Sequence, residues 1–300
     1  MLPKISIITP SYNQGMFLEE TILSILNQNY PNLEFIIIDG GSNDQTIEII
    51  EGYRHVLKYW ETNKDNGQAH AINKGFKKST GDIITFCSSD DIYLPNTLLY
   101  IGEKWEKWKN FGAFSGSFIY MDGNSNFIGQ KRKPMMLKNG PTDLTIGEFG
   151  NYRLHQVSTF YNKNAIDNVG RYVDEKYNYV FDRELLYRIV KSYPIYMDEK
   201  LLGAFRIHQD SKSVSKIIPF SKEFSSLYLS RKSGELCDDF IRKKKSKYYL
   251  YRGYIKYSIQ QKKISYSIIF LIMALRFYPI SIFTLSYWVK WKYLVIKMLK

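Results

Sequence analysis

The sequence predicts an α/β domain built on a mostly parallel sheet flanked by helices, followed by a basic helical tail. Short apolar, β-branched runs alternate with segments in which apolar residues recur at helical spacing, as in sheets with crossover helices. Charge also divides the chain of 300 residues: the last 70 hold 16 Lys and Arg against 3 Asp and Glu, whereas the first 230 hold 26 of each. A hydrophobic content of 44% excludes a disordered chain.

The first strand is expected at Lys4–Thr9, an apolar, β-branched run that ends at Pro10. The segment Phe17–Gln28 follows with apolar residues on a helical period, and Pro31 prevents its continuation. Another apolar run, Leu33–Ile38, is expected as the next strand. Strand, helix and strand at this spacing predict a crossover unit with two parallel strands.

The same alternation continues beyond this unit. Asn43 or Asp44 can cap the next helix, and Pro95 can open a later one at a position where its missing N–H breaks no hydrogen bond. The elements expected here are the helix Thr46–Tyr53, the strand Val56–Trp60, the helix Ala69–Lys78, the strand Asp82–Phe86 and the helix Asn96–Lys109.

Polar residues collect where three of the expected strands end. They are Thr9 to Asn13 after the first strand, Asp39 to Ser42 after the second, and Ser88 to Asp91 after the strand Asp82–Phe86. In open α/β sheets, ligands bind outside the carboxyl ends of the strands. Ordinary turn chemistry explains any one of these clusters, but the three together predict a ligand site.

Asp90 and Asp91 stand side by side at a strand end without a Lys or Arg near them in the sequence. Two adjacent carboxylates repel each other, and a divalent cation is a common way to offset that repulsion. Mg²⁺ and Mn²⁺ prefer oxygen ligands and often bridge carboxylates to substrate phosphates. In isolation, Asp91 could instead cap the following helix.

With these motifs in place, the chain resembles the family 2 glycosyltransferases, which have the nucleotide-sugar-binding GT-A fold. The resemblance spans roughly residues 4–215, with the motifs in matching order and spacing. They are ISIITPSYN (5–13), TILSILNQ (21–28), FIIIDGGSNDQT (35–46), DNGQAHAINKG (65–75), GDIITFCSSDD (81–91), HQVSTFY (155–161), YVFDRELLYR (179–188) and FRIHQDSKS (205–213).

This resemblance implies a domain organisation. Residues 1–215 would form the catalytic domain, with a nucleotide-binding half at 1–110 and an acceptor half at 111–215. Residues 216–300 have no counterpart in the resemblance and would form a basic, aromatic-rich helical tail.

The resemblance also implies roles for individual residues. The nucleotide part of the donor would contact Thr9, Pro10, Ser11, Tyr12, Asp39, Asp65, Gly67, Asp90 and Arg206. Mn²⁺ or Mg²⁺ would bind Asp91 and His208. Asp182 would be the catalytic base, and His155 and Gln156 would shape the acceptor side. His70 stands where relatives often carry an acid, so it receives no role.

The residues themselves support the role of Asp182 in one respect. It lies in an aromatic stretch with Tyr177, Tyr179 and Phe181, and burial there would raise the pKa of a carboxyl group and suit it to accept a proton. The alternative interpretation is a helix N-cap, because apolar residues follow at helical spacing.

The implied activity is a metal-dependent, inverting transfer of one sugar from a nucleotide-diphosphate sugar, with UDP as the first choice, to a hydroxyl of an oligosaccharide or lipid-linked acceptor. It would serve bacterial surface polysaccharide synthesis. A nucleotidyltransferase acting on sugar phosphates would need a basic, Gly-rich loop after the first strand, and residues 9–15 contain no Lys or Arg. A catalytically silent scaffold would predict loss of the acidic pair or of the base position, and both are present.

The tail interleaves Lys and Arg with Tyr at 241–263 and continues as an apolar run at 264–275. That run is too short to span a bilayer, and Arg276 and Pro279 interrupt it. We expect peripheral attachment to an anionic membrane surface. Packing on the body or on a second subunit, a single span and nucleic-acid binding remain alternatives, although no RNA-binding motif is present.

The N-terminus has a strand pattern without a cleavable signal, so we expect a cytoplasmic protein on the inner face of the membrane. Cys87 and Cys237 are the two cysteines, which excludes a disulfide framework. We expect each to be a buried or idle thiol in a reducing compartment.

Overall fold

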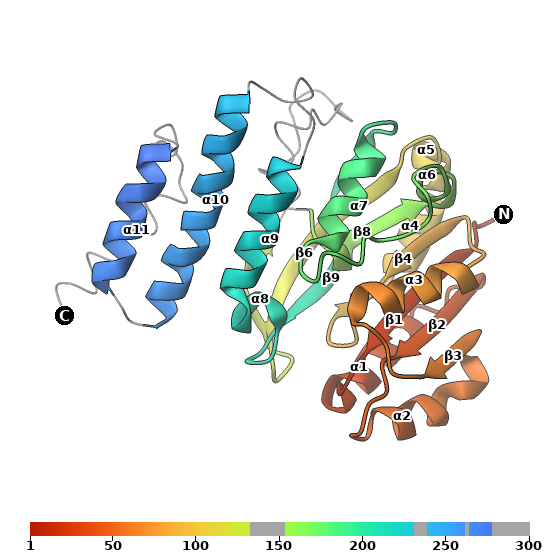
Figure 1. Cartoon of the computed structure of the whole chain (residues 1–300). Helices are drawn as coiled ribbons and strands as arrows, with labels where there is room; N and C mark the ends of the chain where they lie inside the picture. Colours follow the sequence, from red (N-terminus) through yellow and green to blue (C-terminus); the bar gives the residue numbers. More distant parts are fainter. Residues whose placement is uncertain (133–153, 231–238, 262–263, 278–300) are drawn as a thin grey trace. The chain divides into compact units, whose positions relative to one another are not determined.

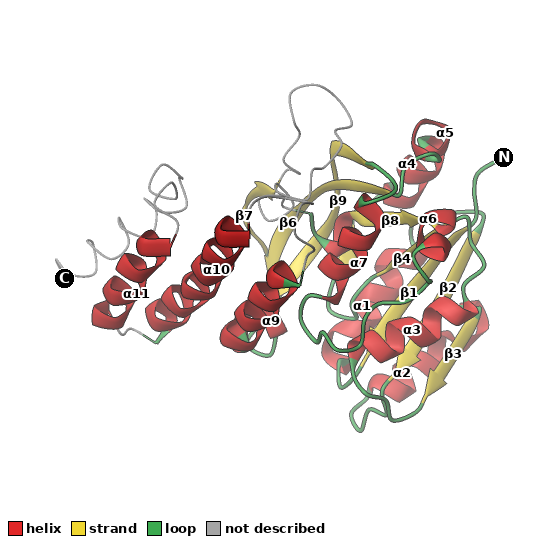
Figure 2. Ribbon diagram, turned by 45° about the horizontal axis from the view of Figure 1, so that its top comes forward, coloured by secondary structure: helices red, strands yellow, loops and turns green. Residues whose placement is uncertain are grey.

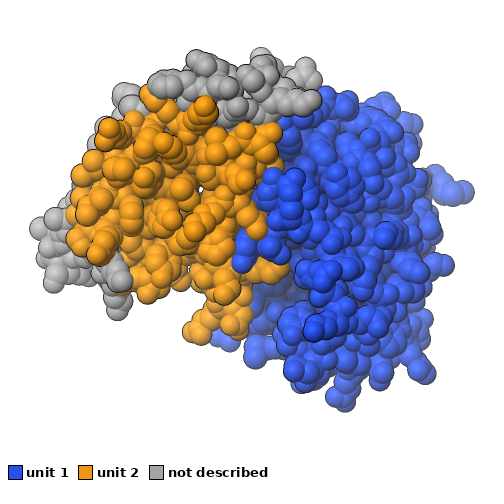
Figure 3. Space-filling model, in the orientation of Figure 1, with its two compact units in different colours: residues 1–208 blue, residues 209–300 orange. Residues whose placement is uncertain are grey.

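The computed structural model describes residues 1–132, 154–230, 239–261 and 264–277. The chain divides into two compact units, Met1–His208 and Gln209–Lys300, which Figure 3 colours separately. The division lies close to the end of the expected catalytic domain at residue 215. Each unit is described by itself below.

The first part of unit 1 is a run of parallel strands joined by helices (Figure 1). Its first strand pairs with the second on one side and with the fourth on the other, always in parallel. The elements are β1 (Ile5–Ser11), α1 (Gly15–Leu26), β2 (Leu33–Asp39), α2 (Thr46–Tyr53), a 3₁₀ turn (Arg54–Val56), β3 (Tyr59–Thr62), α3 (Gln68–Lys78) and β4 (Ile83–Phe86).

The second part of unit 1 completes the sheet with strands of both directions (Figure 2). Its elements are β5 (Ile92–Tyr93), α4 (Thr97–Glu103), α5 (Trp105–Trp108), β6 (Ala113–Asp122), β7 (Phe127–Arg132), a 3₁₀ turn (Gln156–Ser158), β8 (Thr159–Asn162), α6 (Lys163–Asn168), α7 (Phe181–Val190) and β9 (Ile195–Ile207). Within the described residues, nine strands form one sheet in the order β3-β2-β1-β4-β8-β6-β9-β5, with β7 beside β6.

The apolar strands are buried because helices cover both faces of the parallel part. Successive side chains of a strand point to opposite faces. Ile7 belongs to the core cluster that contains Leu18 and Ile22 of α1. Ile8 faces the opposite side of the sheet, against α3. A Cβ on Gly75 of this helix would stand only 2.3 Å from the side chain of Ile8. A strand buried on both faces reads as a continuous apolar run, which is why the sequence identified it.

The α/β domain predicted from the sequence, a sheet flanked by helices, is confirmed, and α2 has the expected bounds. Most of the other expected elements differ from the structure by one or two residues at their ends, and two differ more. The expected strand Val56–Trp60 begins only at Tyr59, because the 3₁₀ turn occupies the preceding residues. The expected helix Asn96–Lys109 breaks at Lys104, and the break turns Trp108 into the core, where its indole N–H donates to Ile101 O at 3.3 Å.

Unit 2 consists, in its described part, of packed helices. They are α8 (Lys212–Ser215), α9 (Ile217–Leu229), α10 (Asp239–Gln260) and α11 (Ile264–Phe277). Buried serine pairs link the three longer helices: the Oγ atoms of Ser225 and Ser246 are 2.6 Å apart, and those of Ser258 and Ser267 are 2.8 Å apart. No helix among these residues is both long enough and apolar enough to cross a bilayer. The rest of the expected apolar tail, beyond Phe277, lies outside the described residues.

Glu34 lies near the start of β2, at the end of the sheet opposite the carboxyl ends of the parallel strands, and its ionised side chain is held by hydrogen bonds. Its buried carboxylate accepts hydrogen bonds from Ser6 Oγ at 2.6 Å and from Thr80 N at 2.7 Å, and it pairs with Lys4 Nζ at 3.0 Å. Burial alone would raise the pKa of Glu34, but these bonds favour the charged form more strongly and lower it.

We therefore expect Glu34→Gln to lower the melting temperature at pH 7.5 by roughly 3–8 °C, since hydrogen bonds to a charged group contribute about 1.5–3 kcal/mol. Because the pKa of Glu34 is lower in the folded protein than the value of about 4.3 in the unfolded chain, its ionised carboxylate stabilises the folded state above pH 4.3. This stabilisation is lost as the pH falls through the pKa of the folded protein. The difference in melting temperature between wild type and Glu34→Gln should therefore become smaller below pH 4. Exposed Glu51→Gln is the control, and a gap that does not depend on pH would contradict the assignment.

Candidate functional site

The carboxyl ends of β1, β2 and β4 meet at one edge of the sheet. Ser11 is paired with Asp39 in the register of β1 and β2, and the N–H of Gly40 donates to Ser11 O at 2.9 Å. The N–H of Cys87 donates to Ile8 O at 2.9 Å, which joins β1 to the segment after β4. The three polar clusters predicted from the sequence are therefore neighbours in space.

Asp39 organises the loop after β2. Its fully buried carboxylate accepts hydrogen bonds from the N–H groups of Gly41 and Ser42, and from the hydroxyls of Ser42 and Thr62, at 2.5–3.0 Å. A buried carboxylate needs such donors, because an unpaired one loses its solvation. Asp39 thereby ties β3 to this loop.

The loops after β1 and β2 hold each other. The N–H of Asn13 donates to Ser42 Oγ at 2.7 Å, and the N–H of Gly15 donates to Asp44 Oδ2 at 3.0 Å. The ring of Tyr12 remains 60% exposed beside them. An aromatic ring left in solvent on a fixed loop is available to stack on a planar ligand.

Two hydroxyls at the end of β1 lack partners. Thr9 Oγ1 and Ser11 Oγ are buried, and neither has a hydrogen bond within the described part of the chain. Their side chains fall on the same face of β1, because they are two residues apart. Buried polar groups of this kind are costly unless a ligand or water satisfies them.

Asp65 and Gly67 complete the edge next to β2. The carboxylate of Asp65 lies so close to Gly40 that a Cβ on that glycine would stand 3.1 Å from it, and Asp65 Oδ1 accepts from the N–H of Gly67 at 2.8 Å. Gly67 has φ +104°, which other residues rarely adopt.

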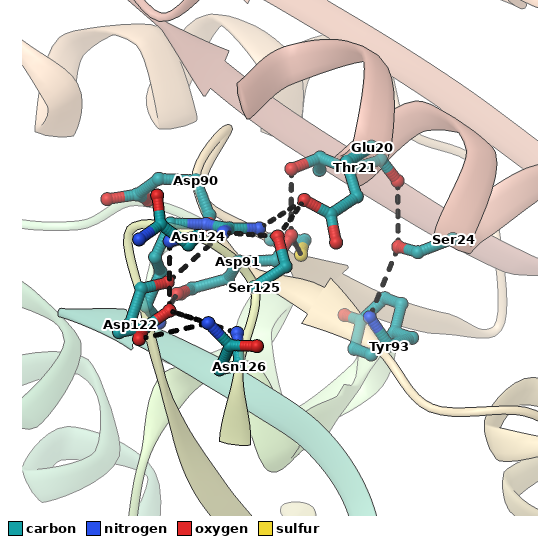
Figure 4. Close-up of polar contacts among 12 residues, drawn as sticks. Glu20, Thr21, Ser24, Asp90, Asp91, Tyr93, Asp122, Asn124, Ser125 and Asn126 are labelled. Atoms are coloured by element: carbon teal, nitrogen blue, oxygen red, sulfur yellow. Dashed lines mark hydrogen bonds and ion pairs between the residues drawn. The ribbon is translucent and has the colours of Figure 1, made fainter. Parts of the chain in front are cut away.

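The acidic pair lies at the end of β4 (Figure 4). Asp91 is fully buried; its Oδ1 accepts from the backbone N–H of Arg206 at 2.9 Å, whereas its Oδ2 is buried without a partner among the described residues. Burial, followed by the charge of Asp90, raises the pKa of Asp91 well above its ordinary value. Asp90 Oδ2 lies 3.1 Å from Nε2 of His208.

Arg206 and His208 reach the pair from the end of β9. The Arg206 side chain is fully buried, and its Nε donates to Asp90 O at 2.7 Å. The ring of Phe17 on α1 packs against both residues, 4.7 Å from the guanidinium and 4.8 Å from the imidazole ring. Two strands and a helix thus converge on two adjacent carboxylates.

Asp182 is the second residue of α7, whose N-cap is Val180. The alternative interpretation of Asp182 as the helix N-cap is therefore wrong. Burial raises the pKa of Asp182, and Arg183 and backbone N–H groups oppose this only in part. The neighbouring Phe181 ring lies 6.2 Å from that of Phe86, the last residue of β4. The hydroxyl of Tyr161 has no partner among the described residues, and burial, followed by the charge of Asp182, raises its pKa well above its ordinary value.

His155 is held between two aromatic rings, those of Phe118 at 4.6 Å and Phe205 at 4.3 Å. Burial, with a smaller effect from Arg183, lowers its pKa to about 3, so the ring is neutral at physiological pH. Gln156 follows it in a buried 3₁₀ turn.

The donor set at the end of β4 fits a divalent cation that is shared with a substrate. No group of three or more His, Cys, Asp and Glu side chains in the described part of the chain is arranged to enclose a metal ion. Mg²⁺ and Mn²⁺, however, commonly take only one or two carboxylates from a protein and complete their shell with waters and phosphate oxygens. The unpaired Oδ2 of Asp91, with Asp90 and His208 beside it, is such a partial set.

A comparison with models of known protein families assigns the chain to a family. The model of glycosyl transferase family 2 matches residues 6–178, which is more than half of the chain. The chain belongs to glycosyl transferase family 2. The matched residues include the parallel strands and the acidic pair.

Similar proteins agree with the family 2 assignment. An uncharacterized glycosyltransferase of Haemophilus influenzae is 41% identical over 129 residues, which cover 42% of this chain and 48% of that relative. The chain thus matches about half the length of this curated relative.

Two solved structures show the same fold. A mannosyltransferase of Pyrobaculum calidifontis in complex with GDP-Man and Mn²⁺ superimposes with a TM-score of 0.62, at 16% identity, over 100% of this chain and 87% of that one. TarS of S. aureus, residues 1–349 with UDP-GlcNAc, superimposes with a TM-score of 0.56, at 16% identity, over 89% and 80% of the two chains.

Three partners in the site were not singled out from the sequence of this family 2 protein. They are Glu20, Thr62 and Ser125, which contact Arg206 or Asp39. Asp-Gly-Asn-Ser-Asn at 122–126 carries a turn signal, but nothing in it indicates that Ser125 contacts an arginine 81 positions away.

Cys87 agrees with its expectation as an idle thiol. It is fully buried and free, and burial raises its pKa further from the range in which a reactive thiolate forms. Cys237 lies outside the described residues.

Proposed function

We propose that this protein is a metal-dependent, inverting glycosyltransferase that moves one sugar from a nucleotide-diphosphate sugar to an acceptor hydroxyl. The observation that carries the proposal is the acidic pair that follows β4, the strand beside β1: Asp91 is fully buried, and its Oδ2 has no partner among the described residues. The related structures with bound GDP-Man and Mn²⁺, and with bound UDP-GlcNAc, support a nucleotide-sugar donor.

The donor would lie along the carboxyl edge of the parallel strands. The unpaired hydroxyls of Thr9 and Ser11 are available to its polar atoms, and the exposed ring of Tyr12 is available to its base. The other residues proposed to contact the nucleotide are Pro10, Asp39, Asp65, Gly67 and Asp90. Asp91 and His208 would hold Mn²⁺ or Mg²⁺, which when bound would offset the charge of the leaving diphosphate.

Asp182 would act as the base. Its raised pKa suits a carboxylate that accepts a proton. As the acceptor oxygen bonds to the anomeric carbon, the bond from that carbon to the diphosphate oxygen breaks and the hydroxyl proton passes to Asp182. One displacement from the opposite face inverts the configuration. We propose an oligosaccharide or lipid-linked acceptor, on the side of the site where His155 and Gln156 lie.

A donor screen combined with one substitution tests the metal and nucleotide assignments. We expect UDP or GDP to raise the melting temperature more with Mn²⁺ than with EDTA, and Asp91→Asn to abolish the Mn²⁺-dependent part of this effect while the unliganded protein stays folded. Because burial raises the pKa of Asp91 and a cation binds the ionised carboxylate, wild-type affinity for Mn²⁺ should increase as the pH rises. Asp167→Asn, in a surface ion pair of α6, is the control. Equal Mn²⁺-dependent binding by Asp91→Asn would refute the metal assignment.

The base assignment predicts a different kinetic pattern. Asp182→Asn should lower turnover by ~10²-fold or more, while donor affinity stays nearly unchanged, because proton transfer occurs after the donor binds. Asp174→Asn, a nearby carboxylate paired with Lys176, should retain activity. An equal loss of turnover and donor affinity, together with a lower melting temperature, would indicate a structural role instead.

We also propose that unit 2 binds an anionic membrane surface. Tyr266, Ile269 and Ile272 of α11 are 53–57% exposed, and their spacing of three residues places them on one side of the helix. The opposite side, with Leu271 and Ala274, packs into the core of unit 2. An apolar stripe on a strongly cationic segment fits the interface of an anionic bilayer.

Co-sedimentation with vesicles tests this attachment. The full chain should sediment with anionic vesicles at low salt, and high salt should weaken but not reverse binding, because screening does not affect the apolar contacts. Replacing Ile269 and Ile272 by Ser should weaken partitioning by about tenfold or more. Val56→Ser removes an exposed apolar side chain from unit 1 and serves as the control. A wild-type protein that stays in the supernatant at low salt would exclude the membrane proposal.

A further inference from the structure

The guanidinium of Arg206 is directed into the protein. With its side chain fully buried, it donates from Nε to Asp90 O, from one terminal nitrogen to Asp122 O and Ser125 Oγ, and from the other to Glu20 Oε2. These donors are therefore already engaged with protein acceptors. A residue in this state is poorly suited to contact a diphosphate directly, which is the role that the resemblance implied for it.

The same residue holds both members of the acidic pair. Its backbone N–H donates to Asp91 Oδ1 at 2.9 Å, and its side-chain Nε donates to the backbone carbonyl of Asp90 at 2.7 Å. The first bond leaves Oδ2 as the oxygen of Asp91 that has no partner in the described part of the chain. Arg206 therefore determines how the carboxylates are presented.

Glu20 and Ser125 hold the guanidinium from the other side. Glu20 on α1 pairs with Arg206 at 2.6 Å, and the hydroxyl of Ser125 in the turn between β6 and β7 donates to Glu20 Oε2 at 2.7 Å while accepting from Arg206 at 2.8 Å. Figure 4 shows Glu20, Asp122 and Ser125 gathered around the strand end that carries the acidic pair.

The charges of this group matter for a cation. A buried positive charge beside two carboxylates would repel a divalent cation at the same place. Glu20 offsets that charge. With the carboxyl groups ionised, Asp90, Asp91 and Arg206 together carry a net charge of −1, and Glu20, which pairs with Arg206, brings the group to −2 and makes it more attractive to a cation.

We propose that Arg206 and Glu20 form a positioning pair, in which Arg206 orients the acidic pair and Glu20 neutralises Arg206 so that the acidic pair can hold a divalent cation. This inference rests on the proposed function. Neither residue touches the donor in this account. Residues that orient metal ligands typically change metal affinity by about 10–100-fold when they are replaced.

The test compares Glu20→Gln, Arg206→Lys and the control Glu19→Gln. Glu19 is the neighbouring acid on α1, and it accepts a hydrogen bond from Tyr53 instead. Glu20→Gln keeps the size of the side chain and an acceptor oxygen but removes the charge. For each variant, calorimetry gives the affinity for Mn²⁺ at saturating UDP and the affinity for UDP in EDTA, and the melting temperature reports the fold.

We expect Glu20→Gln to weaken Mn²⁺ binding by roughly tenfold and to leave UDP binding in EDTA unchanged. Arg206→Lys should weaken Mn²⁺ binding at least as much, and Glu19→Gln should match wild type. A merely structural role would lower the melting temperature without this selective loss of Mn²⁺ affinity. If Arg206→Lys fails to fold, Ser125→Ala replaces it, with the same expected direction.

Two outcomes overturn the positioning pair alone. In the first, wild type binds Mn²⁺ with UDP and Glu20→Gln binds it equally well. In the second, Glu20→Gln tightens UDP binding and Arg206→Lys weakens it equally with Mn²⁺ and with EDTA, which would mean that the guanidinium contacts the diphosphate. If wild-type UDP binding does not depend on Mn²⁺, the proposed function and the positioning pair both fail.

Discussion

The burial of the Asp91 carboxylate is the constraint on which the rest of the site depends. A carboxylate that is removed from water must find donors, become protonated or bind a cation. Within the described part of the chain, one of its oxygens accepts a hydrogen bond, from the backbone of Arg206, and the other has no partner. That bond requires β9 to return to the end of β4, and the short pairing of Ile92 with Ala204 brings it there. The pairing of β9 with β5 therefore places a hydrogen-bond donor beside the acidic pair that follows β4.

Two buried carboxylates at the same edge of the sheet have different functions. Asp39 accepts hydrogen bonds from four donors and shapes the loops around it. Asp91 keeps an oxygen without a partner among the described residues. Donors on both oxygens fix the carboxylate of Asp39 in place beside the proposed nucleotide site, whereas Oδ2 of Asp91 is available to a cation. The same edge of the sheet therefore has a loop held firmly by Asp39 and a carboxylate oxygen of Asp91 that is available to coordinate a cation.

The helices of unit 2 pack differently from the elements of unit 1. Its buried contacts include serine pairs and the small residue Gly253, where a Cβ would stand 1.8 Å from Ser221 Oγ. Small residues at these contacts let the helices approach closely. Some of the large apolar side chains of α11 lie outside these contacts and are exposed. Ile269 and Ile272 point outward on a segment that carries the excess positive charge of the whole chain. By contrast, acidic and basic residues are equal in number over residues 1–230.

The sequence by itself determined the parallel strands, most of the helices between them, the three polar clusters and the acidic pair. Apolar runs, helical periods and strand-end positions are properties of short segments, so they can be read without knowing the fold. Only the tertiary structure decided the partners: the break at Lys104 follows from the burial of Trp108, and Glu20 meets Arg206 across 186 positions. Such contacts depend on how strands pair and helices pack, because the free energy of burying a charge is set by neighbours that are distant in the chain.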